Sequence, residues 1–340
     1  MNSSDQALND WRSQAHAVEE GVSKVVIGQE RAIRSITIAL FTRGHVLLEG
    51  DVGVGKTTLL RAVARAIGGD YARIEGAIDL MPNDLIYYTY LNEQGKPCVD
   101  PGPILQHGES LATFFFNEIN RARPQVHSLL LRVMAERSIQ AFNREFHLPH
   151  LQVFADRNRL EKEETFELPS AARDRFLMEL TINTPTDTAI QRELMVNPRF
   201  HDIDALVEEV PKAIVQFDEL NGASIKIQRE INTSETLQNY VIDLCRASRE
   251  PADFGVTVSD IDISRLVQAG VSPRGMSMLL RAGRTAAWLE GREHVVPEDI
   301  RSVFRETISH RIFLNPIHEM QRASIMPMFI DAILQQVATP

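Results

Sequence analysis

The chain has 340 residues and a formal net charge of −10 at pH 7, and 44% of its residues are hydrophobic. This length and composition fit a globular protein of two domains. The acidic balance argues against a nucleic-acid-binding protein, because a phosphate backbone attracts basic surfaces. Cys98 and Cys245 are too far apart to indicate a disulfide framework or a zinc site, and they fit a reducing compartment.

No targeting or membrane segment is evident in the sequence. Residues 1–10 are polar and acidic, without the basic and apolar regions of a signal peptide. No apolar stretch reaches the length needed to span a bilayer. We therefore expect a cytoplasmic protein with no membrane span.

Helical and strand-like patterns alternate in the first half of the chain. Apolar residues at helical spacing predict helices at residues 56–67 and 124–137, and two more within residues 5–42 that are separated at residues 27–29. Short apolar runs predict buried parallel strands at residues 45–49, 71–75, 111–117, 151–155 and 176–182. This alternation indicates an α/β domain over residues 1–183. Residues 184–340 read as nearly all helical, which predicts a second, helical domain.

A phosphate-binding loop follows the first predicted strand. Residues 50–57 read G-D-V-G-V-G-K-T and satisfy the pattern G-x-x-x-x-G-K-[ST] between a predicted strand and a predicted helix. The glycines let backbone N–H groups curl around a polyphosphate, and the helix N-terminus adds positive potential. We therefore predict that ATP and Mg²⁺ bind here. The predicted nucleotide-binding residues of this segment are Gly50, Asp51, Val52, Gly53, Val54, Gly55, Lys56, Thr57 and Thr58.

Two side chains of this loop have predicted roles of their own. Lys56 is expected to reach the β- and γ-phosphates, and the Thr57 hydroxyl is a hard oxygen ligand for Mg²⁺. A glycine-rich turn that binds nothing would need neither residue.

An acidic element follows the predicted strand at residues 111–117. In phosphate-loop ATPases such a strand ends in Asp, which holds the Mg²⁺ shell, and then Glu, which polarises the attacking water. Here the pair is Asn117 and Glu118. Glu118 is the predicted general base. Asn117 keeps an oxygen near the metal but lacks the charge, so we expect loose Mg²⁺ binding and slow turnover unless Glu118 or another carboxylate supplies that charge.

Ordered fragments along nearly the whole chain resemble the MoxR-type AAA+ ATPases, which are relatives of the magnesium-chelatase ATPase subunit. Residues 117–122 (NEINRA) are similar to the family's D-E-I-N-R-A, residues 154–158 (FADRN) to F-A-T-Q-N, and residues 168–176 (LPSAARDRF) to L-P-E-A-Q-L-D-R-F. Further similar segments are residues 26–30 (VIGQE), 272–274 (SPR), 295–299 (VVPED) and 310–311 (HR). The order and spacing of these fragments carry the resemblance.

The resemblance implies roles for three more residues. Asn158 falls on the sensor-1 asparagine, which would orient the hydrolytic water, although Arg159 stands where the family has proline. Arg175 falls on the arginine finger that reaches a neighbouring subunit's nucleotide, and the nearby Arg173 could substitute for it. Arg274 falls on sensor 2, where the lid helix turns an arginine onto the phosphates. Arg121 and Arg123 are interpreted as surface charge.

The resemblance also implies a fold and a function. The fold would be an AAA+ αβα parallel sheet followed by an all-helical lid, assembled into a homo-oligomeric ring, expected to be a hexamer. The function would be that of an ATP-hydrolysing chaperone that remodels, assembles or activates a client enzyme complex, often a metal-containing one, together with a partner that carries a von Willebrand factor A (VWA) domain. The alternatives are a metal-chelatase-type ATPase subunit and a slow nucleotide-dependent scaffold, the latter suggested by Asn117. A DNA-acting motor is disfavoured by the acidic charge.

Two segments look like insertions into a minimal sheet. Residues 79–103 fall where the resemblance predicts a helix-2 insert, and residues 138–149 predict a hairpin. Tyr87, Tyr88 and Tyr90 crowd the first insert. They could grip a substrate, but we interpret them as residues whose β-propensity holds a hairpin together.

Overall fold

The computed structural model describes residues 3–158 and 166–340, and the chain forms two compact units. The sheet unit comprises Ser13–Phe176 and Leu180–Gly222. The helical unit comprises Met1–Arg12, Leu177–Glu179 and Ala223–Pro340. The domain boundary predicted between residues 183 and 184 stays a prediction. No helix of the described ranges combines the length and apolarity needed to cross a membrane.

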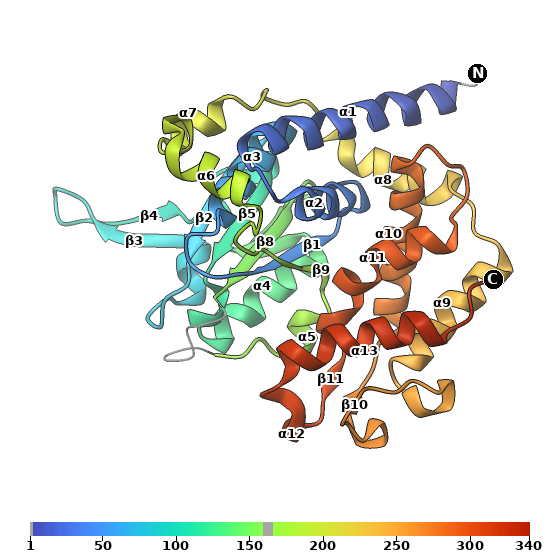
Figure 1. The fold of residues 1–340 in the computed structure, drawn as a ribbon. Helices are drawn as coiled ribbons and strands as arrows, with labels where there is room; N and C mark the ends of the chain where they lie inside the picture. Colours follow the sequence, from blue (N-terminus) through green and yellow to red (C-terminus); the bar gives the residue numbers. More distant parts are fainter. Residues whose placement is uncertain (1–2, 159–165) are drawn as a thin grey trace. The chain divides into compact units, whose positions relative to one another are not determined.

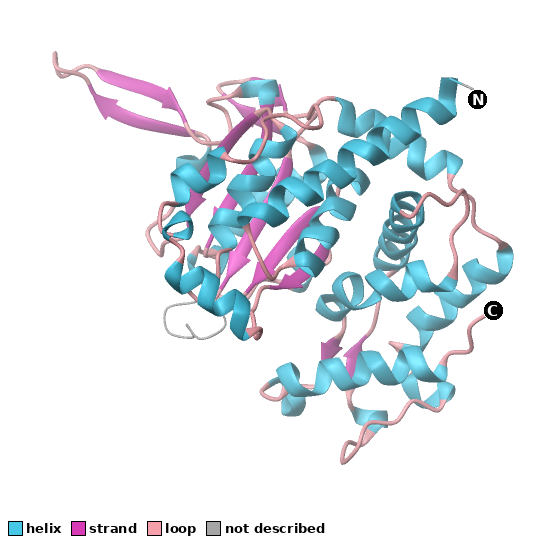
Figure 2. Cartoon of the chain, turned by 45° about the horizontal axis from the view of Figure 1, so that its top comes forward, coloured by secondary structure: helices cyan, strands magenta, loops and turns pink. Residues whose placement is uncertain are grey.

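A five-stranded sheet organises the sheet unit, with the strand order β2-β5-β8-β1-β9 (Figures 1 and 2). Its strands are β1 (His45–Glu49), β2 (Asp70–Glu75), β5 (Leu111–Asn117), β8 (Gln152–Arg157) and β9 (Phe176–Thr181). The β2–β5, β5–β8 and β8–β1 ladders are parallel. The predicted α/β class with a parallel sheet is confirmed.

The centre of this sheet is apolar because parallel strands are covered on both faces. Every residue of β5 is buried, and Phe114, Phe115 and Phe116 are fully so. Val126 and Leu130 belong to the same buried cluster as Phe114 and Phe116. Burial of one such side chain contributes roughly 1.5–3 kcal/mol.

Helices surround the strands in the sheet unit (Figure 2). They are α2 (Glu30–Thr42), α3 (Lys56–Ile67), α4 (Pro124–Glu136), α5 (Ser170–Arg173), α6 (Thr188–Val196) and α7 (Ile203–Glu208); α1 (Ser3–Val25) and α8 (Glu219–Glu230) each belong to both units. The predicted break between the first two helices lies at the turn around Gly28, which has a φ of 76°. Pro124 begins α4, where its missing N–H costs nothing.

Both predicted insertions contain hairpins. The first consists of β3 (Tyr87–Leu91) and β4 (Pro97–Pro101), which extend away from the sheet in Figure 1, and the second of β6 (Ser138–Ala141) and β7 (Arg144–His147). The rings of Tyr87 and Phe142 lie 5.2 Å apart, so the two hairpins contact each other. Tyr88 and Tyr90 are exposed.

Besides residues 177–179 of β9, the described part of the helical unit contains helices and one short antiparallel ladder, which the sequence pattern did not indicate. Its remaining elements are α9 (Glu235–Ala247), β10 (Val267–Ala269), α10 (Pro273–Leu289), α11 (Pro297–Ile308), β11 (Phe313–Leu314), α12 (Pro316–Glu319) and α13 (Arg322–Gln336). Ser272 caps α10 by accepting a hydrogen bond from the Gly275 N–H at 3.1 Å. A Cβ on Gly275 would lie 2.6 Å from the Arg311 side chain, so this buried position requires glycine.

Candidate nucleotide-binding site

The predicted site lies where three neighbouring strands of the sheet end. The phosphate loop follows β1, Glu118 follows β5, and Asn158 follows β8. In open parallel sheets, ligands bind outside the carboxyl ends of the strands. Residues far apart in the sequence are therefore brought together at one edge of the sheet.

Glycine is required at both ends of the loop. Gly55 precedes α3 with a φ of 89°, a left-handed conformation that other residues rarely adopt. A Cβ on Gly50 would lie 2.4 Å from the carbonyl oxygen of Ile182. Between them, Asp51, Val52 and Gly53 are exposed. The middle of the loop is therefore open to solvent, while Gly50 is closely packed and Gly55 holds a left-handed backbone.

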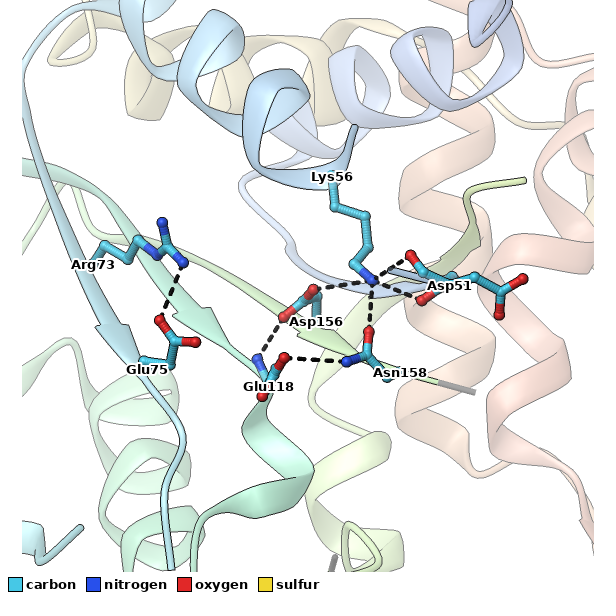
Figure 3. A network of polar contacts seen from close by, with 8 residues as sticks. Asp51, Lys56, Arg73, Glu75, Glu118, Asp156 and Asn158 are labelled. Atoms are coloured by element: carbon cyan, nitrogen blue, oxygen red, sulfur yellow. Dashed lines mark hydrogen bonds and ion pairs between the residues drawn. The ribbon is translucent and has the colours of Figure 1, made fainter. Parts of the chain in front are cut away.

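Lys56 points into a cluster of oxygen atoms (Figure 3). Its Nζ donates to the carbonyl oxygen of Gly50 at 2.6 Å, to that of Asp51 at 3.1 Å, and to Asn158 Oδ1 at 2.9 Å. Asp156 Oδ2 lies 3.4 Å from the same nitrogen. The Lys56 side chain is only 8% exposed, so these oxygens stabilise an ammonium that burial would otherwise disfavour. Phosphate oxygens would compete for the same cation.

Glu118 is held from both ends. Its backbone has a φ of 52°, and its N–H donates to Asp156 Oδ1 at 2.6 Å. Its Oε1 accepts from Asn158 Nδ2 at 3.1 Å, and its Oε2 pairs with Arg121 Nη1 at 3.0 Å. Asn158 therefore links the ammonium of Lys56 to the carboxylate of Glu118.

Asp156 lies at the centre of these contacts and is almost completely buried. Burial raises its pKa, and the hydrogen bond from the Glu118 N–H and the nearby Lys56 ammonium oppose that shift. With the Asn117 amide oriented to satisfy its neighbours, Nδ2 donates to Asp156 Oδ1 at 3.2 Å and Oδ1 accepts from Arg73 at 3.1 Å. Asp156 is therefore a buried carboxylate that contacts the phosphate-loop lysine and both residues of the predicted acidic pair.

The structure brings together part of the predicted set. Lys56, Glu118 and Asn158 are joined by hydrogen bonds, and Asn117 lies beside them through Asp156. Thr57 and Thr58 are half-buried in the first turn of α3. Their roles as ligands stay predictions.

The two predicted arginines belong to other elements of the fold. Arg175 follows α5, where its Nη1 donates to the carbonyl oxygen of Ala171 at 2.9 Å. Arg274 is an exposed residue in the first turn of α10, in the helical unit. Arg159 lies outside the described residues. The finger and sensor roles of Arg175 and Arg274 stay predictions.

Sequence reasoning missed two residues of this cluster. Asp156 was indicated only by its place near the end of a predicted strand, two residues before Asn158. Arg121, interpreted as surface charge, pairs with the predicted base. An acidic residue at the carboxyl end of a strand next to the phosphate loop was the signal that could have identified Asp156.

Comparison with known proteins decides the family. A model of the ATPase family associated with various cellular activities (AAA) matches residues 45–178, and a model of the AAA lid domain matches residues 260–329. The chain is 56% identical over 336 residues to Protein MoxR of Methylorubrum extorquens, covering 99% of this chain and 98% of that protein. This chain belongs to the MoxR family of AAA ATPases.

Two more distant proteins agree with this assignment. Chaperone MoxR1 of Mycobacterium tuberculosis is 31% identical over 334 residues, covering 96% of this chain and 84% of that protein. A solved structure of a putative ATPase from Cytophaga hutchinsonii has a TM-score of 0.84 and 31% identity, and the match covers 99% of this chain and 98% of that one. The MoxR-family chain is therefore an ATPase with an AAA domain and a helical lid.

Proposed function

We propose that this MoxR-family ATPase binds ATP together with Mg²⁺ and uses hydrolysis to remodel, assemble or activate a partner enzyme complex. The observation that carries the proposal is the hydrogen-bonded series Lys56–Asn158–Glu118 at the carboxyl edge of the sheet. It joins a phosphate-binding cation to a carboxylate that can accept a proton. A surface loop without a reaction to perform would not require this connection.

The residues present fit a nucleotide with its metal. Thr57 offers a hydroxyl oxygen, and Glu118 and Asp156 offer carboxylates, which are the hard oxygen donors that Mg²⁺ prefers. When bound, Mg²⁺ would neutralise charge on the phosphates. Across the described residues no cluster of three or more His, Cys, Asp and Glu side chains suggests an additional metal centre.

Each residue of the series has a separate task in this proposal. Lys56 moves its ammonium from the carbonyl oxygens of Gly50 and Asp51 to the phosphates. Glu118 accepts the proton of the attacking water, and Asn158 orients the Glu118 carboxylate through its 3.1 Å hydrogen bond. Arg121 holds the other carboxylate oxygen and limits its rotation.

The remaining roles require more than one subunit. AAA ATPases form oligomers, and we propose a homo-oligomeric ring, a hexamer, in which Arg175 contributes to the nucleotide site of a neighbouring subunit. Arg274 would contact the phosphates from the lid. Both assignments rest on the matching family motifs and on the two matched family models.

The proposed partner is a protein with a VWA domain that connects the ring to a client enzyme, often one that contains a metal. Support comes from the family resemblance and from a relative that is named a chaperone. The free thiols of Cys98 and Cys245 fit the reducing cytoplasm as the place of action.

Trapping the ATP-bound state tests this function. A tagged Glu118→Gln variant should retain the VWA protein and its client in the presence of ATP, because hydrolysis no longer releases them. Lys56→Ala is the matched control, since it removes nucleotide binding from the same fold. Equal recovery of partners with both variants would contradict a nucleotide-driven function.

Asn117 favours one alternative, a scaffold that binds ATP and hydrolyses it slowly. Under that alternative the partner would remain bound to the wild type for as long as to Glu118→Gln. Single-turnover hydrolysis measured with saturating Mg²⁺ separates the two functions, because the scaffold would show similar slow rates in both proteins.

A further inference from the structure

An amide and a carboxylate occupy adjacent strand ends beside the phosphate loop. The parallel β5–β8 ladder pairs Phe116 with Ala155, so Asn117 and Asp156 are the next residues of the two strands. With its amide assigned the orientation that satisfies its neighbours, Asn117 Nδ2 lies 3.2 Å from Asp156 Oδ1. The negative charge that is missing at the end of β5 is therefore present on the neighbouring strand.

The Asn117 amide is already engaged at both of its polar atoms. Its oxygen accepts from Arg73, which also pairs with Glu75 at 3.3 Å, and its nitrogen donates to Asp156. The atom that Asn117 presents toward β8 is therefore a hydrogen-bond donor, which repels a cation. This orientation makes Asn117 a poor source of the charge or the oxygen that a metal needs.

Asp156, in contrast to Asn117, presents an acceptor oxygen toward the phosphate loop. Its Oδ1 accepts from the Glu118 N–H and from Asn117, while its Oδ2 lies 3.4 Å from the Lys56 ammonium. The second oxygen therefore already faces a cation on the phosphate-loop side. Its side chain is 2% exposed, and a buried carboxylate is strongly disfavoured without a positive partner.

We propose that Asp156, on β8, supplies the carboxylate charge toward Mg²⁺ that Asn117 lacks on β5. This inference rests on the proposed binding of ATP with Mg²⁺. If Lys56 turned to the phosphates, Asp156 would lose the ammonium that balances its charge, and its carboxylate would be available to balance the charge of Mg²⁺ bound with the nucleotide. The carboxylate that faces the metal would thus lie at the end of β8 instead of at the end of β5.

A purely structural role for Asp156 makes a different prediction. Asp156 also accepts the Glu118 N–H, so it could act only by fixing the backbone before the base. Asp156→Asn keeps an oxygen that can accept this hydrogen bond but removes the charge. The double variant Asn117→Asp/Asp156→Asn returns one charge to the site, on the adjacent strand. Only a role that depends on the charge would be restored by this exchange.

The experiment measures binding rather than turnover. A fluorescent, non-hydrolysable ATP analogue is titrated without Mg²⁺ and then at increasing Mg²⁺, and Mn²⁺ retention by the nucleotide complex is followed by electron paramagnetic resonance. For Asp156→Asn we expect a Mg²⁺ requirement raised about 10–100-fold, the range typical of losing a residue that hydrogen-bonds to the ligands of a metal. Affinity without Mg²⁺ should stay near that of the wild type. The exchanged double variant should recover most of the Mg²⁺ effect.

Glu49→Gln is the matched control. It removes a carboxylate from the end of β1, where Glu49 pairs with Arg157 at 3.2 Å, and it should leave the Mg²⁺ requirement unchanged. An unaltered Mg²⁺ requirement in Asp156→Asn would overturn the proposal. If Asp156→Asn is too unstable to measure, the double variant Asn117→Asp/Asp156→Asn tests the proposal instead. A folded double variant whose analogue binding depends only weakly on Mg²⁺ would also overturn the proposal. A wild type that binds the analogue without any Mg²⁺ effect would instead refute the proposed function.

Discussion

Lys56 donates to the side-chain oxygen of Asn158 at 2.9 Å, although 102 positions separate the two residues in the chain. The same Asn158 donates to Glu118 from its amide nitrogen. Movement of Lys56 to a phosphate would leave Asn158 Oδ1 without this donor, and the side chain could then reorient together with Glu118. Occupancy of the phosphate loop is thereby connected to the position of the proposed base.

Replacement of Lys56 by alanine should abolish nucleotide binding. The substitution removes the ammonium that Gly50, Asp51 and Asn158 now hold inside the loop and that phosphates would attract. Equilibrium binding of a fluorescent ATP analogue measures the effect. Lys24→Ala, which removes an exposed lysine paired with Glu20, is the control and should bind normally. Wild-type affinity in Lys56→Ala would refute the loop assignment.

Glu118→Gln should bind ATP but hydrolyse it about 10²–10⁴-fold more slowly, the usual contribution of a general base. Glutamine keeps an oxygen that can accept the Asn158 hydrogen bond, so the fold should be preserved. ATP turnover and analogue binding are measured on the same preparation. The exposed Glu145→Gln on β7 provides the control. Unchanged turnover in Glu118→Gln would mean that another residue is the base.

Arg175→Ala should be inactive alone and regain partial activity when mixed with inactive Glu118→Gln. Mixed rings would contain interfaces at which an intact Glu118 meets an intact Arg175 of the neighbouring subunit. Steady-state ATPase activity after verified subunit exchange is the measurement. Mixing Arg175→Ala with a subunit that carries both substitutions should restore nothing, because no intact arginine is then supplied. Absence of rescue in the first mixture would remove the support for a finger at Arg175.

Patterns that repeat along the chain predicted much of the fold. The helix that begins at Lys56 and the buried strand at residues 111–117 follow from local residue types, and the structure confirms them. Phosphate binding by the loop before Lys56 stays a prediction. The short β10–β11 ladder has no comparable signal, because a strand of two or three residues shows no alternation of apolar and polar positions.

Contacts between strand ends were harder to predict. The roles proposed for Lys56 and Glu118 follow from motifs that lie within a few residues. The position of Asp156 beside both Asn117 and Lys56 depends on the order of β5, β8 and β1 in the sheet and on their register. A single sequence indicates that such strands exist but does not fix which of them are neighbours. The pairing of Arg121 with Glu118 similarly depends on the left-handed backbone at Glu118.

Acid should destabilise the sheet unit through His45, at the start of β1. Its Nδ1 accepts from the Val153 N–H at 2.9 Å and its Nε2 lies 3.2 Å from the Met134 carbonyl oxygen, so both nitrogens are used by the neutral ring. Burial lowers the pKa of His45 to about 3. Because the folded-state pKa lies below the unfolded value of about 6.5, this stability is present above pH 6.5 and is lost as the pH falls toward 3.

The expected loss through His45 is about 2 kcal/mol between pH 7 and pH 5. Urea unfolding followed by circular dichroism at both pH values measures it, with His45→Asn as the control that lacks the titrating ring. The wild type should lose more stability on acidification than the variant does. Equal losses in the two proteins would show that His45 does not titrate in this manner.

Asn117→Asp should fail to improve the ATPase and should destabilise the fold. The new carboxylate would replace a donor nitrogen 3.2 Å from Asp156 Oδ1, so two buried acidic groups would face each other, and the contact with Arg73 would only partly offset the repulsion. One carboxyl of such a pair has its pKa raised above the unfolded value. The stability deficit of Asn117→Asp is therefore small at low pH and grows as the pH rises, reaching roughly 1–3 kcal/mol near neutrality.

Melting temperatures from pH 5 to pH 8 measure this deficit in Asn117→Asp, and Asn143→Asp at the exposed turn between β6 and β7 is the matched control. Adding Asp156→Asn should remove the deficit, because the pair then carries a single charge.

The competing expectation is that no other residue replaces the charge missing at Asn117. It predicts a lower Mg²⁺ requirement and faster turnover in Asn117→Asp without a loss of stability. That result would assign the metal-facing charge to the end of β5 and leave Asp156 only its contacts with Lys56 and the Glu118 N–H.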